Sequence, residues 1–130
     1  MSQLSVTLQR RDPPLAVVAL YGEHDGYSST RLDNELAVLL DGGFGVVVDL
    51  SDTTFIDSQT LSVLLATRHC AQESDLGFTV VLPDEGHVHL HRRLDVTGLR
   101  TAFAVFGSLS EACDAARSGV AGGGRVHAGS

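Results

Sequence analysis

The sequence contains no lysine, and this absence excludes several kinds of chemistry. All nine of its basic residues are arginines. A protein without lysine has no P-loop lysine to hold nucleotide phosphates, no lysine to form a Schiff base with a carbonyl substrate and no lysine general base. These functional classes are therefore excluded before any motif is considered.

Basic residues and aromatic side chains are both scarce. Sixteen acidic residues outnumber the nine arginines and leave a net charge of -7, while aromatic residues make up 5% of the chain and tryptophan is absent. Nucleic acids and anionic membranes attract clustered basic residues, and single-stranded nucleic acids also use aromatic stacking platforms. We therefore expect neither nucleic acid nor a membrane as a direct partner.

Cysteines and long apolar runs are few as well. Cys70 and Cys113 lie far apart and form no CxxC motif, so we expect reduced thiols rather than a disulfide framework. The N-terminal residues show no signal-peptide pattern, and the longest apolar run, residues 15–21, is far below the ~20 residues that span a bilayer. These features predict a cytoplasmic protein.

The residues that are present show the pattern of one α/β domain. The chain has 130 residues, of which 43% are hydrophobic, and this is enough to bury a core. Alternating or continuous apolar runs predict strands, and apolar residues spaced three or four apart predict helices. The expected order is ββαβαβαβα, a small, mainly parallel mixed sheet with packed helices and one antiparallel edge. Strands are expected over residues 4–8, 15–20, 45–50, 78–82 and 101–106, and helices over residues 30–41, 58–73, 84–95 and 109–117.

Turn and cap signals set the expected boundaries. Residues 22–29 are polar and predict a loop, after which Thr30 with Asp33 could cap the first helix. Ser108 and Glu111 form a capping-box pattern before the last helix. The chain is glycine-rich after Gly119, so we expect one domain over residues 1–118 and a disordered, dispensable tail over residues 119–130.

The most informative segment joins a buried strand to a helix. It reads VVVDLSDTTFIDSQTLSVLL over residues 46–65, and the helix begins near Ser58. Asp57 or Ser58 could simply cap this helix, since the first N–H groups of a helix lack internal acceptors. Alternatively, Ser58 is an exposed hydroxyl whose modification would place a dianion beside Asp57. The residues alone leave both interpretations open.

Three blocks of residues in a fixed order carry a family resemblance. Residues 22–25 read GEHD and residues 94–99 read LDVTGL. The third block, between them, fits D-L-S-x-x-x-F-[IM]-D-S-[SA]-G-L at Asp49, Leu50, Ser51, Phe55, Ile56, Asp57, Ser58 and Leu61. Together the blocks resemble the STAS domain of anti-sigma-factor antagonists over about residues 4–117. The resemblance implies the STAS (SpoIIAA-like) fold.

The resemblance also implies a bacterial regulatory protein rather than an enzyme. Members of the family bind an anti-sigma factor of the serine-kinase type and thereby free a sigma factor. The kinase phosphorylates the motif serine, which releases the antagonist, and a PP2C-type phosphatase restores it. Carried over to this chain, the phosphorylation site is Ser58 and the partner-binding residues are Glu23, Asp25, Asp57, Ser58, Gln59 and Thr60. No cofactor or metal is implied.

The chain departs from the family pattern at three positions. Gln59 and Thr60 replace a small residue and a glycine after the acceptor serine, and His24 replaces an aliphatic residue. Larger residues beside Ser58 would enlarge the surface that a kinase must approach. The alternative function is therefore a STAS scaffold or ligand-sensing module without a working phosphoswitch, whose partner is a second copy or a related STAS protein.

Rival functions have weaker support in the sequence. His87 and His91 share a helical spacing of four with His89 between them, but a third metal ligand would have to come from elsewhere. The residues around Ser58 lack the glycines of a hydrolase nucleophile elbow. A receiver-domain phosphorelay needs the lysine that this chain lacks. The five phenylalanines are expected to pack in the core.

Overall fold

The computed structural model describes residues 3–24, 26–82, 89–90 and 101–122. The six strands form one sheet in the order β1-β2-β3-β4-β6, and β5 pairs with β3 beside this path. β1 is antiparallel to β2, and every other pair is parallel, so the predicted mixed, mainly parallel α/β fold is confirmed. The elements are β1 (Gln3–Gln9), β2 (Leu15–His24), α1 (Gly26–Asp41), β3 (Gly45–Ile56), α2 (Ser58–Glu73), β4 (Phe78–Val81), β5 (His89–Leu90), β6 (Ala104–Phe106) and α4 (Leu109–Arg117).

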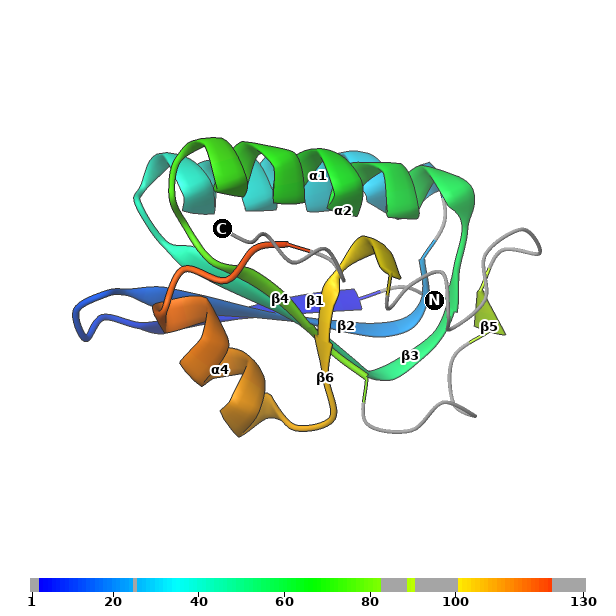
Figure 1. The fold of residues 1–130 in the computed structure, drawn as a ribbon. Coiled ribbons are helices and arrows are strands. Elements are labelled where there is room, and N and C mark those ends of the chain that lie inside the picture. Colours follow the sequence, from blue (N-terminus) through cyan, green and yellow to red (C-terminus); the bar gives the residue numbers. More distant parts are fainter. Residues whose placement is uncertain (1–2, 25, 83–88, 91–100, 123–130) are drawn as a thin grey trace.

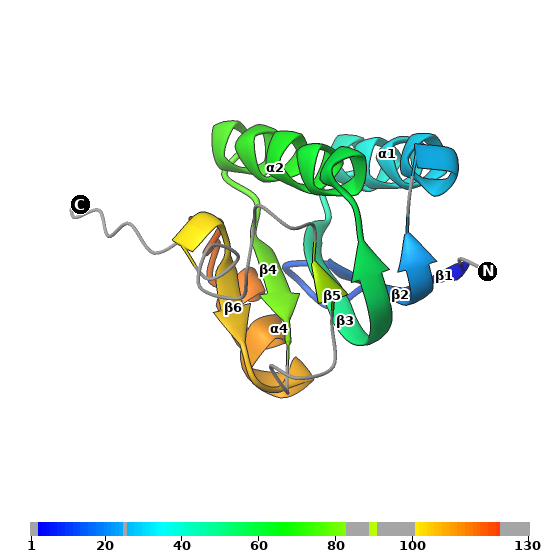
Figure 2. The ribbon, with the colours of Figure 1, turned by 90° about the vertical axis from the view of Figure 1, so that its right-hand side faces the viewer.

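Helices cover the two faces of the sheet unequally. Figure 1 and Figure 2 show α1 and α2 side by side over one face and α4 alone over the other. Eighteen buried residues form the cluster that includes the inward sides of α1 and α2, which we call the major core. Seven buried residues, three of them from α4, form the minor core on the opposite face. Among the described residues, the larger cluster of buried hydrophobic side chains therefore lies on the α1/α2 side of the sheet.

Several predicted elements are confirmed close to their expected bounds. The first two strands form an antiparallel hairpin, α2 begins at Ser58, and α4 begins after Ser108. The hydroxyl oxygen of Ser108 accepts the main-chain N–H of Glu111 at 3.2 Å, as the capping-box pattern predicts. Phe78 and Phe103 are buried in the major core, with ring centroids 6.2 Å apart.

The loop predicted over residues 22–29 is wrong. β2 continues to His24 because β3 is long enough to pair with it, and Glu23 lies opposite Phe55 in the register. α1 already begins at Gly26, so Thr30 lies inside the helix instead of at its start. Pairing satisfies the backbone groups of residues 22–24 whatever their side-chain polarity, and this partner was not visible in the local pattern.

The helix predicted over residues 84–95 is contradicted where the structure describes that segment. His89 and Leu90 form β5, which pairs with Phe55 and Ile56 at the end of β3. Residues 88–91 alternate apolar and polar side chains, so a strand period was present beside the helical spacing. The rest of the predicted helix, including His87 and His91, lies outside the described residues.

The C-terminal part of the domain also differs from the prediction. The main-chain N–H of Phe78 donates to the carbonyl of Val120 at 2.8 Å, and Ala121 is buried in the major core. Gly119 has φ +83, a left-handed conformation that ends α4 and redirects the chain. Residues 120–122 therefore belong to the domain, and the remainder of the expected tail lies outside the described residues.

The last strand is shorter than expected. Residues 101–102 are helical, and β6 covers only Ala104–Phe106. The hydrogen bond from the Arg68 guanidinium to the carbonyl of Ala102, together with the stacking of Arg68 over Phe103, ties these residues to α2.

Candidate functional site

The site begins where β3 passes into α2. Asp57 stands between them with extended backbone angles, φ -92 and ψ 178. Its carboxylate Oδ1 accepts the N–H of Thr60 at 2.9 Å, and its carbonyl accepts the N–H of Leu61 at 3.1 Å. Asp57 is therefore the N-cap of α2, and the capping interpretation is confirmed for this residue. The N–H groups of Ser58 and Gln59 have no acceptor within the described residues.

Some polar residues in the first turn of α2 face solvent, and one faces the core. Ser58 and Gln59 are exposed, whereas Thr60 is 0% exposed. Its hydroxyl oxygen is buried without a hydrogen-bond partner in the part of the chain that is described. The expectation that Thr60 contacts a partner is therefore wrong, because this position turns inward with Leu61 and Leu64 toward the major core.

Two exposed acidic residues lie in β2 and β3 ahead of the start of α2. Glu23 is exposed at the end of β2, opposite Phe55 and so only two residues from Asp57 in the sheet register. Asp52 is also exposed and lies opposite Tyr21. The one ion pair found among the described residues joins His69 and Glu73 on α2. Within that part of the chain, no basic side chain forms an ion pair with Glu23 or Asp52. Asp25, the other acidic residue expected at the site, lies outside the described residues.

β3 reaches the site through two shifts in its register with β2. The shifts fall between Ala19 and Tyr21 and between Gly22 and Glu23 of β2. At the first shift, Asp49 Oδ1 accepts both the N–H and the hydroxyl of Ser51, at 2.9 and 2.5 Å. Asp49 and Ser51 are therefore hydrogen-bonded to each other at the register shift of β3. The sequence did not predict this role.

The remaining candidate groups form no metal site or disulfide among the described residues. No set of three His, Cys, Asp or Glu side chains is placed there to hold a metal ion. Both cysteines are free thiols; Cys70 is exposed, and burial raises the pKa of Cys113. No described helix has the length and apolar character needed to span a membrane. The block at residues 94–99 lies outside the described part of the chain.

The geometry suits a protein-contact surface that a phosphate can modify. An exposed hydroxyl stands at the first position of a sixteen-residue helix, where free N–H groups and the helix dipole favour an anion. The carboxylate of Asp57, the residue directly before it, would repel the same anion. Phosphate at Ser58 would therefore be compatible with the fold and would change the charge of the surface.

Comparisons with known proteins agree with this architecture. A crystal structure of an anti-sigma factor antagonist from Mycobacterium paratuberculosis is 30% identical, with a TM-score of 0.66 over 88% of this chain and 95% of that one. A protein from Shewanella loihica, described as uncharacterized with a SpoIIAA-like fold, has a TM-score of 0.56 at 12% identity, over 89% and 95% of the two chains, and shows the fold alone. No curated protein gave a significant match. The family model described as "Mlab, STAS domain" matches residues 7–111, and the chain therefore belongs to the STAS domain family.

Proposed function

We propose that this chain is an anti-sigma-factor antagonist that acts by protein–protein contact and catalyses no reaction itself. In this proposal its partner is a cytoplasmic anti-sigma factor of the serine-kinase type, and binding releases a sigma factor that directs bacterial transcription. The exposed hydroxyl of Ser58, directly after the Asp57 cap, is the observation that carries the proposal. The similarity to the Mycobacterium paratuberculosis antagonist supports the same partner class.

Phosphorylation of Ser58 is the proposed off switch, and a PP2C-type phosphatase is the proposed means of reversal. A phosphoserine adds a charge of about -1.5 to -2. The added charge would meet Glu23 and Asp57 at one edge of a chain that already carries -7. A partner that fits the acidic surface would lose contact when the hydroxyl becomes a dianion, because a misplaced interfacial charge costs several kcal/mol.

The experiment compares substitutions at Ser58 for binding to the anti-sigma factor recovered from native cytosol with the unphosphorylated chain. Ser58→Ala should keep binding within about twofold and lose phosphorylation, since a rim hydroxyl contributes little. Ser58→Asp should fold normally and bind at least tenfold more weakly, a change of about 1.4 kcal/mol. Isothermal titration calorimetry measures the affinities, and mass spectrometry locates the phosphate.

Ser110→Asp is the matched control. Ser110 is an exposed serine in the first turn of α4, so this variant adds the same charge at another helix start. Its affinity should equal that of the unmodified chain. Tight binding by Ser58→Asp, or equal weakening by Ser110→Asp, would contradict the proposed switch.

A STAS scaffold without a phosphoswitch is the second candidate, and one observation favours it. Gln59 is exposed beside Ser58 where the family pattern has a small residue. If Gln59 obstructs the kinase, Gln59→Ala should raise the phosphorylation rate several-fold. Absence of phosphate in both the natural chain and Gln59→Ala, with recovery of STAS proteins only, would select the scaffold.

A further inference from the structure

The open edge of the sheet lies along β1. β1 pairs with β2 on one side, and no described strand pairs with its other edge. Its seven residues read QLSVTLQ and pair with β2 in continuous register from Gln3 to Gln9. Proteins commonly protect such edges with charged residues, proline or bulges. β1 contains no charged residue or proline, and its register with β2 shows no bulge, so it is suited to pair with another strand.

The sequence of β1 is nearly symmetric about Val6. Leucines stand two residues to either side of Val6, the hydroxyl residues Ser5 and Thr7 stand next to it, and glutamines stand at both ends. If two copies pair antiparallel about a two-fold axis at Val6, Leu4 lies opposite Leu8, and Ser5 lies opposite Thr7. Residues opposite each other in an antiparallel pair share a face, and matched apolar or hydroxyl pairs stabilise it.

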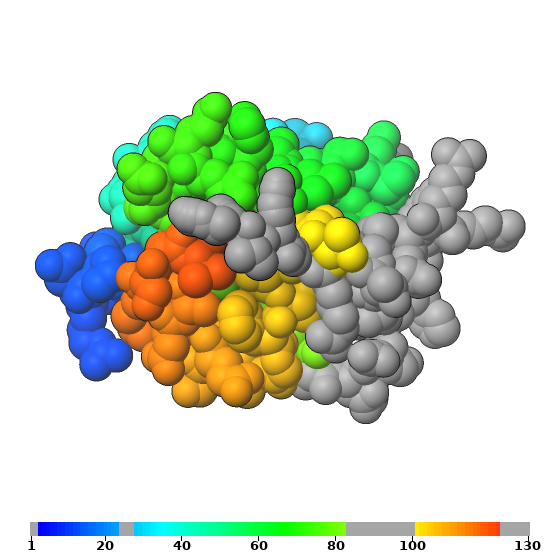
Figure 3. All heavy atoms as spheres, in the orientation of Figure 1, coloured from blue at the N-terminus to red at the C-terminus, as the bar shows by residue number. Residues whose placement is uncertain are grey.

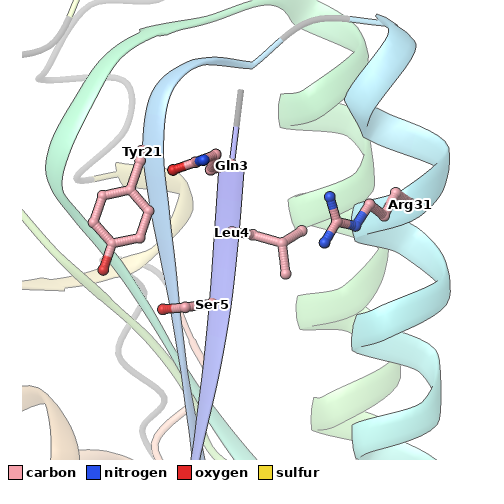
Figure 4. A pocket seen from close by; sticks show the side chains of 5 residues that line it. All are labelled: Gln3, Leu4, Ser5, Tyr21 and Arg31. Atoms are coloured by element: carbon pink, nitrogen blue, oxygen red, sulfur yellow. The ribbon is translucent and has the colours of Figure 1, made fainter. Parts of the chain in front are cut away.

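The surroundings of Leu4 and Leu8 fit this pairing. Leu8 is 39% exposed, although Leu4 and Val6 on the same side of the strand pack against the major core. A hollow of about 330 Å³ lies at the other end of β1, lined by Gln3, Leu4, Ser5, Tyr21 and Arg31. Figure 4 shows Leu4 pointing toward Arg31 of α1, with Tyr21 and Ser5 on the other side of the strand. In the symmetric pair, the exposed Leu8 of one copy enters the hollow beside Leu4 of the other.

From these observations we propose that β1 is a homodimer interface, in which two copies pair antiparallel about Val6 and join their sheets into one. The pairing satisfies edge N–H and C=O groups and covers Leu8 in both copies at once. This interface uses neither Ser58 nor Gln59, so it is independent of the proposed function.

Sedimentation equilibrium of the full chain tests the interface. The apparent mass should rise with concentration from 13.7 kDa toward twice that value. Leu8→Lys should weaken association at least tenfold, because it brings a cation to Arg31 of the second copy. Leu8→Glu should weaken association less, because the same arginine attracts it. Since Leu8 is exposed at a sheet edge, both variants should fold, which circular dichroism verifies.

Val38→Lys is the control for surface charge. Val38 is 68% exposed on α1, and this variant should associate like the natural chain. A single species of 13.7 kDa at all concentrations up to millimolar would overturn the proposal. A dimer that Leu8→Lys does not weaken, or that Leu8→Lys and Leu8→Glu weaken equally, would also overturn it.

Disulfide cross-linking tests the register. In a Cys70→Ser background, Val6→Cys places two thiols on the two-fold axis, where Cα atoms of opposite residues are ~4.5–5.5 Å apart and a disulfide can form. Leu8→Cys places them four residues apart along the strands, or ~13 Å, which is too far. Covalent dimers from Val6→Cys alone are expected, and equal yields from both variants would overturn the Val6-centred register.

Discussion

The two faces of the sheet use the same strands but have unequal cover. α1 and α2 have sixteen residues each and enclose the major core, whereas α4 has nine and encloses seven buried residues in the minor core. Regions with fewer buried apolar contacts open at lower free energy. We therefore infer that the α1/α2 layer, whose edge carries Ser58, is the rigid part of the domain, and that α4 separates from the sheet first.

Matched leucine deletions give the largest expected difference between the two faces. Leu64 of the major core and Leu15 of the minor core are both 0% exposed. Leu64→Ala should lower the free energy of unfolding by about 4 kcal/mol and Leu15→Ala by about 2–3, within the range for buried leucines. The reason is that Leu64 lies in the cluster of eighteen buried residues and Leu15 in the cluster of seven. Urea unfolding measures both free energies of unfolding. Equal losses would show that the two cores contribute equally to stability.

Gly77→Ala should weaken the α4 side selectively. A Cβ atom at Gly77 would stand 2.1 Å from the carbonyl oxygen of Ala116 in α4, so the helix must move away. Overpacking of this kind costs about 1–3 kcal/mol. In a Cys70→Ser background, the buried thiol of Cys113 should then react faster with a thiol reagent, while amide exchange in α2 stays slow.

Gly107→Ala is the control for this substitution, because nothing lies within 4 Å of its Cβ position. It should leave the reaction rate of Cys113 unchanged. If Gly77→Ala accelerated amide exchange in α2 as much as the Cys113 reaction, the two faces would open together and the comparison would be wrong.

Truncation at the C-terminus gives the smallest expected effect and defines where the domain ends. A chain ending after Ser118 loses the Val120 carbonyl that accepts from Phe78 and loses the buried Ala121. Its free energy of unfolding should fall by about 1–2 kcal/mol, since a buried donor loses its acceptor. A chain ending after Gly122 should melt like the full chain. Equal melting temperatures for the two truncations would show that residues 119–122 do not contribute.

The fold was predictable from the sequence wherever the apolar period was regular. Residues 46–50 and 78–81 are buried almost without interruption, and the leucines of α1 and α2 recur at helical spacing, so both periods could be read locally. The period fails after Leu50, where the next buried residues of β3 are Thr53 and Ile56. This spacing of three follows from pairing with β2, and a local pattern does not reveal a distant partner.

The site was predictable in type but not in every residue. The D-S pair correctly indicated the start of α2, because an acidic cap before a helix has a local signature. Thr60 was assigned to the partner-binding surface because it falls in the family motif after the acceptor serine, yet the rotation of α2 on the sheet turns it inward. The mutual bonding of Asp49 and Ser51 depends on a register shift, which only the folded sheet defines.

The two register shifts of β3 also constrain the length of the chain ahead of Ser58. Each shift adds one residue to β3 that β2 does not match, and a strand that gains or loses one residue exchanges its inward and outward sides. Because there are two additions, the exchange happens twice, and Ile56 returns to the major core, on the same side of β3 as Val48 and Leu50. The even number of extra residues thus anchors the end of β3 in the major core directly ahead of the Asp57 cap, and a β3 shorter by one residue would turn the position of Ile56 away from that core.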